Sequence, residues 1–165
     1  MIVVNSDFIG RYELALDKFS VDKIDYYIDK YEKKYLIQLL GVELYDLFID
    51  DLDVNNEPVT AKYITIYEAL NYDNNGSIIT SDGIKEMLLG FIFYHYTNDN
   101  TQLQTPIGTT SAKAENSNVL GANYNNITRF NDCVASFRSI QQYIEDNISN
   151  YATYNGQYLP FEYLL

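Results

Sequence analysis

The chain has 165 residues, enough for one domain with a sizeable core, and 47% of them are hydrophobic, which excludes a disordered chain. The formal net charge of −12 argues against sequence-independent binding of DNA or RNA and against an anionic membrane surface. The single Cys133 cannot form an intramolecular disulfide, and neither a signal peptide nor a membrane span is expected.

The first third of the chain is predicted to form an N-terminal arm followed by two helices. Residues 1–19 fit an extended arm or strand, and Ser20 is a candidate N-cap for the first helix, which Gly41 is expected to end or kink. Apolar residues at helical spacing mark the buried faces of the two helices: Ile24, Tyr27, Ile28, Tyr31, Tyr35 and Leu39, then Leu44, Leu47, Phe48 and Leu52.

Three further helices are predicted downstream. Pro58 suits the first position of one helix, Ser81 or Asp82 caps the next, and Thr128 caps the last. Their expected buried residues are Val59, Tyr63, Ile66 and Leu70, then Ile84, Met87, Leu88, Phe91 and Ile92, then Phe130, Val134, Phe137, Ile140, Ile144 and Ile148. The sequence therefore predicts one all-α domain of four to five helices, with helices over residues 20–97 and a closing helix over 128–150.

A long polar interval, residues 98–126, separates the last two predicted helices. Loops of this length inside a compact domain are usually functional or disordered. Its apolar residues are Leu103, Pro106, Ile107, Val119 and Leu120. One interpretation is a β-like arm that pairs with a neighbouring subunit, and the other is a disordered surface loop. Contacts with a neighbour are expected at Leu103, Thr105, Pro106, Ile107 and Gly108.

The C-terminal tail, residues 151–165, is rich in aromatic and leucine residues. Such side chains are expected to dock either on this domain or on a neighbour. The residues expected to contact a partner are Tyr154, Tyr158, Phe161, Tyr163 and Leu165.

Candidate catalytic residues are few. His95 is the one histidine, and a histidine on an apolar helical face usually belongs to a core or an interface. A nucleophilic pair of Cys133 and His95 is formally available, without a local motif to support it. The group Asp46, Asp50, Asp51 and Asp53 fits a divalent-cation site or, as we favour, an acidic solvated face. We expect no enzymatic activity, no catalytic residue and no cofactor.

One segment approximates a calcium-binding EF-hand loop. In residues 71–82, Asp73 and Asn75 fit ligand positions, Gly76 fits the sharp turn and Asp82 fits the last position. The other interpretation is a simple turn at Asn74–Gly76 followed by an extended stretch. A calcium-binding regulatory module that uses Asp73, Asn75 and Asp82 is therefore an alternative function.

Several stretches resemble one family. The run from Phe19 to Leu52, FSVDKIDYYIDKYEKKYLIQLLGVELYDLFIDDL, resembles the N-terminal helices of head–tail connector (adaptor) proteins of tailed bacteriophages, and it is most similar to the small connectors of crAss-like phages. The stretches SDGIKEMLLGFIFYHYTND, QTPIGTTSAKAENSN and RFNDCVASFRSIQQYIEDN resemble the family's later helix, arm and closing helix in order. The likeness runs from about Phe8 to Gly156.

The resemblance implies a structural virion protein without catalytic residues. Such a protein would assemble in the host cytoplasm and sit at the head–tail junction, as a commonly dodecameric ring beneath the portal protein. It would contact copies of itself, the portal and a further connector or tail protein, while DNA passes through without specific binding. A helical interaction domain of host origin, with the same arm but no ring, remains a second alternative.

Overall fold

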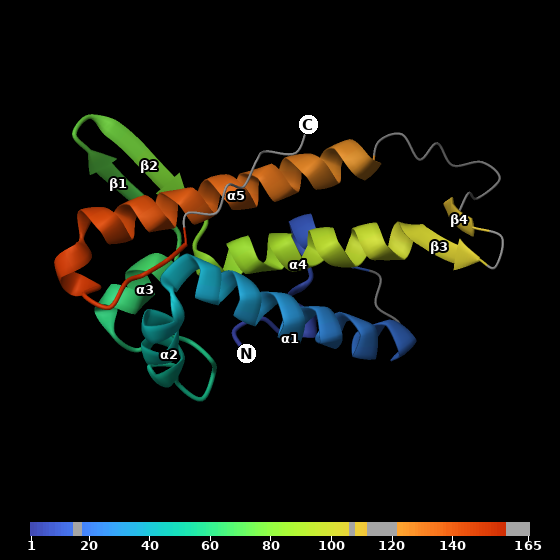
Figure 1. Cartoon of the computed structure of the whole chain (residues 1–165), viewed down its shortest axis with the longest axis horizontal. Helices are drawn as coiled ribbons and strands as arrows, with labels where there is room; N and C mark the ends of the chain where they lie inside the picture. The colour runs from blue at the N-terminus through green and yellow to red at the C-terminus, as the bar shows by residue number, and fades with distance from the viewer. Residues whose placement is uncertain (15–17, 106–107, 112–121, 158–165) are drawn as a thin grey trace.

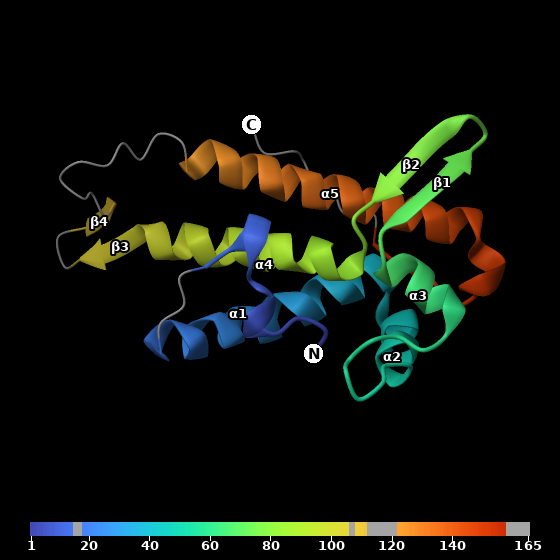
Figure 2. The same cartoon turned by 180° about the vertical axis from the view of Figure 1, so that it is seen from behind.

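The computed structural model describes residues 1–14, 18–105, 108–111 and 122–157, with side chains at 1–14, 21–100 and 125–157. Helix accounts for 66% of the structure. Three long helices form the body: α1 (Lys18–Leu40), α4 (Ile84–Thr101) and α5 (Ala122–Asp146). They lie side by side with α4 in the middle, each antiparallel to its neighbour (Figure 1, Figure 2). The predicted helical fold is confirmed in this coarse form.

Shorter elements occupy the two ends of this layer (Figure 1). At one end lie α2 (Val42–Asp50), α3 (Ala61–Tyr67) and an antiparallel hairpin of β1 (Leu70–Asn74) and β2 (Ser77–Ser81). At the other end, β3 (Gln102–Thr105) pairs with β4 (Gly108–Ser111). Three 3-10 turns complete the described part: η1 (Asn5–Asp7), η2 (Gly10–Tyr12) and η4 (Ile148–Asn150). Because of the two hairpins, the fold is not strictly all-α.

The buried faces of the long helices agree with the predicted periodicity. All the residues named for α1 and α4, and those from Phe130 to Ile144 on α5, are buried. Elsewhere the prediction of burial fails at Leu47, Val59 and Ile148, which are exposed by 45%, 65% and 48%, and Leu52 is only partly buried. Ile148 lies beyond the end of α5. Val59 precedes α3, because the Asp51 carboxylate accepts the backbone N–H groups of Val59 and Thr60 there and helix begins only at Ala61.

The N-terminal residues are not the extended arm that the sequence suggested. They fold into η1 and η2 across α1 and α4 (Figure 2), and Ile2, Val3, Phe8 and Tyr12 are buried. Both carboxylate oxygens of the buried Glu32 on α1 accept the Ile2 N–H at 3.0 Å, and one also accepts the Val3 N–H at 2.9 Å. This residue anchors the start of the chain, because buried backbone donors need a partner.

Helices α1 and α4 meet along a set of aromatic rings, which we call the tyrosine seam. The seam consists of Tyr27, Tyr31 and Tyr35 on α1 with Phe91, His95 and Tyr96 on α4. The Tyr31 and His95 rings stack at 3.9 Å with an interplanar angle of 2°, and Tyr35 stacks on Phe91 at 4.1 Å. Tyr27 meets Tyr96 edge-on at 5.5 Å. Every fourth residue of α1 therefore contributes one ring.

The long polar interval is shorter than predicted, because both flanking helices extend into it. Helix α4 continues to Thr101 and α5 begins at Ala122 rather than at Thr128. In the last turns of α4, the Thr97 hydroxyl donates to Phe93 O and the Asn100 amide donates to Tyr96 O, each four residues back along the helix. The Tyr27 hydroxyl also donates to Asp99. The Tyr27–Asp99 bond joins α1 to α4, and this tertiary contact helps to hold a helix in a sequence of low intrinsic propensity.

Replacing Glu32 with Ala should lower the free energy of unfolding by about 1–3 kcal/mol, because it leaves two buried N–H groups without an acceptor. Glu32→Gln keeps one acceptor oxygen and should cost less. Urea denaturation measures both, with Asp29→Ala on the exposed side of α1 as the control. An Asp29→Ala variant as destabilised as Glu32→Ala would contradict the proposed anchor.

Candidate functional site

His95 and Cys133 each have a structural partner. The Nε2 atom of His95 lies 2.7 Å from the Tyr35 hydroxyl, and burial, then Lys34, lowers the pKa of His95 to about 4. The Cys133 Sγ atom lies 3.6 Å from the Tyr12 hydroxyl, and burial raises the pKa of this thiol to about 12. A neutral stacked imidazole and a protonated buried thiol, bound to different tyrosines, do not form the nucleophile–base pair considered above.

Residues 71–82 form a β-hairpin and not an EF-hand loop. Asn75 and Gly76 occupy the turn with φ values of 51° and 89°, the geometry of a tight Asn–Gly hairpin. Asp73 lies opposite Ile78 and its carboxylate accepts the Gly76 N–H at 2.6 Å. Asp82 lies four residues beyond Ile78, or about 13 Å along the strand, too far to share one calcium ion with Asp73. The predicted turn at Asn74–Gly76, followed by an extended stretch, is confirmed, and the prediction of an EF-hand loop is wrong.

The aspartates after α2 have internal structural roles. Asp51 accepts the backbone N–H groups of Val59 and Thr60, at 2.9 and 2.8 Å, and the Thr60 hydroxyl. Asp53 accepts the N–H groups of Asn55 and Glu57 at 2.8 and 3.0 Å. These bonds shape the loop between α2 and α3. Within the described part of the chain, no group of three or more His, Cys, Asp or Glu side chains is arranged to hold a metal ion.

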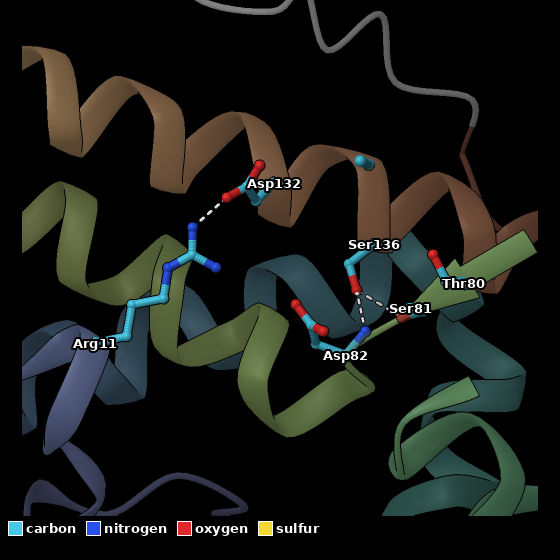
Figure 3. Close-up of a pocket in the computed structure, with 7 residues that line it drawn as sticks. Arg11, Thr80, Ser81, Asp82, Asp132 and Ser136 are labelled. Carbon is cyan, nitrogen blue, oxygen red and sulfur yellow. Dashed lines mark hydrogen bonds and ion pairs between the residues drawn. The ribbon is translucent and has the colours of Figure 1, made fainter. Parts of the chain in front are cut away.

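A small polar pocket lies where η2, the β2–α4 junction and α5 meet (Figure 3). Its volume is about 240 Å³, and its lining residues are Arg11, Thr80, Ser81, Asp82, Asp132, Ala135 and Ser136. Arg11 is paired with Asp132.

The two serines of the pocket join β2 to α5. Their hydroxyls lie 2.6 Å apart, and Ser136 also accepts the Asp82 N–H at 3.0 Å. Ser81 accepts the Gly83 N–H at 3.1 Å instead of capping α4. These groups satisfy one another, so the pocket is a structural junction. Sequence reasoning missed it, because its hydrogen-bonded partners are 54 or 55 residues apart in the chain.

The β3–β4 hairpin projects beyond the ends of the three long helices (Figure 1, Figure 2). It pairs Leu103 with Thr110 and Thr105 with Gly108. Its sheet has two strands, so neither outer edge is paired with another strand within the described residues. Three of the predicted contact residues, Leu103, Thr105 and Gly108, lie on this hairpin, whereas Pro106 and Ile107 lie outside the described residues. Unpaired edges can accept a strand from another chain.

The first part of the C-terminal tail is docked on this domain. Tyr151 is buried and its hydroxyl donates to Lys62 O at 2.6 Å, and Tyr154 packs against the core. The Gln157 N–H donates to Gln38 O at 2.9 Å near the end of α1, which satisfies one of the helix's terminal carbonyls. The structure thus gives Tyr154 an intramolecular contact. Tyr158, Phe161, Tyr163 and Leu165 lie outside the described residues.

No protein-family model, curated protein or solved structure matches this chain. Among the helices that the structure describes, none combines the length and the apolar character that crossing a membrane requires.

The low pKa of His95 predicts a specific pH dependence of stability. Below the usual pKa of about 6.5 the unfolded chain binds a proton at this residue, whereas the folded chain does not until about pH 4. The contribution of His95 to stability is therefore complete above about pH 6.5 and is lost as the pH falls toward 4.

His95→Gln should remove this part of the pH dependence while leaving a polar partner for Tyr35. Urea unfolding midpoints measured at intervals between pH 7 and pH 4 test the expectation. If the urea midpoints of the wild type and the variant changed equally with pH, the protonation of His95 would not differ between the folded and the unfolded chain.

Proposed function

We propose that this protein is a structural adaptor, a head–tail connector whose copies form a ring below the portal of a tailed bacteriophage. The resemblance of residues 8–156 to that family supports the proposal. The observation that carries it is the β3–β4 hairpin, which projects beyond the long helices and whose outer edges pair with no other described strand.

The hairpin suits contact between copies because it offers backbone hydrogen bonds to a neighbour. A strand added to the edge of β3 or β4 would gain main-chain bonds, and alternate side chains would supply specificity. A contact between the hairpin of one copy and a different surface of the next is heterologous. Heterologous contacts generate a closed ring when the rotation closes.

The acidic character of the chain is consistent with a DNA channel. A net charge of −12 disfavours binding to phosphate, so DNA would pass through the ring without being held. Most acidic proteins line no channel, so charge supports the proposal without carrying it. In this proposal the ring also contacts the portal and a further connector or tail protein.

The proposal predicts that assembly depends on the strands of the hairpin while folding does not. Residues 102–105 and 108–111 are replaced by Gly and Ser at constant length. Negative-stain imaging and mass photometry of concentrated protein should show closed rings for the wild type and monomers for the variant. Circular dichroism should give the same helix content for both.

Ile78→Ser in the other hairpin is the matched control, because Ile78 is 74% exposed on β2. This variant should still assemble. Loss of the whole fold in the Gly/Ser variant would place β3–β4 in the core and overturn the argument. A wild type that stays monomeric at all concentrations would contradict a ring built by this chain alone and would favour an interaction domain without a ring.

A further inference from the structure

The negative charge of the chain is concentrated around α2. Between Tyr35 and Ala61 the sequence has six of its 23 acidic residues and none of its 11 Lys and Arg residues. This stretch therefore contributes half of the net charge of −12. It comprises the end of α1, then α2 and the loop that leads to α3. In the structure, α2 and this loop lie at the opposite end of the molecule from the β3–β4 hairpin (Figure 1).

The outward side of α2 combines carboxylates with exposed apolar side chains. Glu43, Asp46, Leu47 and Asp50 follow helical spacing and share one face, while Leu44 and Phe48 are buried on the other. Leu47 is 45% exposed, and Val42 at the start of the helix is 62% exposed. We call the set Val42, Glu43, Asp46, Leu47 and Asp50 the α2 face.

This composition differs from that of a face that only promotes solubility. Ten large hydrophobic residues are exposed in the described part of the chain, and four of them fall between Val42 and Val59. Single exposed apolar residues are ordinary, but Val42 and Leu47 lie on the same short helix as three exposed carboxylates. None of Glu43, Asp46 and Asp50 has a Lys or Arg partner among the described residues. Asp51 and Asp53, by contrast, are committed to backbone N–H groups of the loop.

From this arrangement we propose that the α2 face is a docking site for a Lys- and Arg-bearing apolar segment of another protein. Apolar side chains of the segment would cover Val42 and Leu47, and its cations would pair with Glu43, Asp46 and Asp50. Charge complementarity favours a basic partner over other occupants, because the α2 face and the protein as a whole are both negatively charged. A second copy of this chain would instead meet another molecule with a net charge of −12. The proposal is independent of ring formation through β3–β4.

A synthetic amphipathic peptide of Lys, Leu and Ala serves as the probe, and a scrambled peptide of the same composition serves as its control. Isothermal titration calorimetry at low and moderate salt measures binding to the wild-type protein. We expect saturable binding of the amphipathic peptide, weaker binding of the scrambled peptide, and an affinity that falls with salt.

Two variants with the same change of net charge separate the α2 face from the overall charge. Glu43→Lys, Asp46→Lys and Asp50→Lys together should weaken binding by at least about tenfold. Glu13→Lys, Asp22→Lys and Asp29→Lys together reverse exposed carboxylates elsewhere and should weaken binding by less than about threefold. Leu47→Ala should weaken it by about fivefold, because apolar contact area is lost. Circular dichroism and urea midpoints confirm that each variant is folded.

Equal losses in the two charge variants would mean that overall charge alone attracts the peptide, and would overturn the proposal. Lack of saturable binding, or equal binding of the scrambled peptide, would also overturn it. Concentration-dependent association of the wild type that the α2 variant abolishes would assign the face to a second copy instead of a basic partner. Equal losses in the charge variants, or a lack of saturable binding, would not affect the hairpin test, because neither result concerns the assembly of copies.

Discussion

The arrangement of this molecule depends on the tyrosine seam between α1 and α4. Burial of a tyrosine ring is favourable, but its hydroxyl then needs a hydrogen-bond partner. Tyr27 finds Asp99 at 2.8 Å and Tyr35 finds His95 at 2.7 Å, and these partners lie one helical turn apart on α4. A slip of one turn between the helices would bring Tyr31 opposite one of these partners and leave the other without a tyrosine, whereas the observed register satisfies both. The seam therefore fixes the axial register of α1 against α4, which apolar packing alone would leave loosely specified.

The register of the seam determines where the outlying elements lie. Helix α4 leads directly into β3, and α1 leads through Gly41 into α2. Because α1 and α4 are antiparallel, their C-terminal ends lie at opposite ends of the molecule, and so do the β3–β4 hairpin and the α2 face. The 18 residues of α4 span about 27 Å between them. Gly41 permits the turn at φ 79°, where a Cβ atom would lie 2.6 Å from Asn155 O. The C-terminal segment thus reinforces the junction that orients α2.

Apolar periodicity was sufficient to predict the cores of α1, α4 and α5, and the Asn75–Gly76 pair predicted its turn. The ends of helices were less predictable, because Asn98–Thr101 and Ala122–Asn126 read as loop by propensity and are helical in the structure. No local sequence pattern marks Glu32 as buried, since its partners Ile2 and Val3 lie about thirty residues away and donate through the backbone. The Ser81–Ser136 hydrogen bond could not be predicted from the local sequence either, because the two residues are 55 positions apart. Of the predicted contact residues, those on β3–β4 fall on a projecting element, whereas Tyr154 packs inward.

The distribution of charge bears on how such subunits could associate. Copies with a net charge of −12 repel one another, so a ring needs an attraction that does not depend on charge. Backbone hydrogen bonds at the edge of β3–β4 meet that requirement, because strand pairing is formed by neutral groups. The α2 face has the opposite character, since its carboxylates are useful only against a partner that carries cations. We infer that the two surfaces bind different partners. The hairpin binds other copies of this chain, and the α2 face binds a different, basic protein at the other end of the molecule.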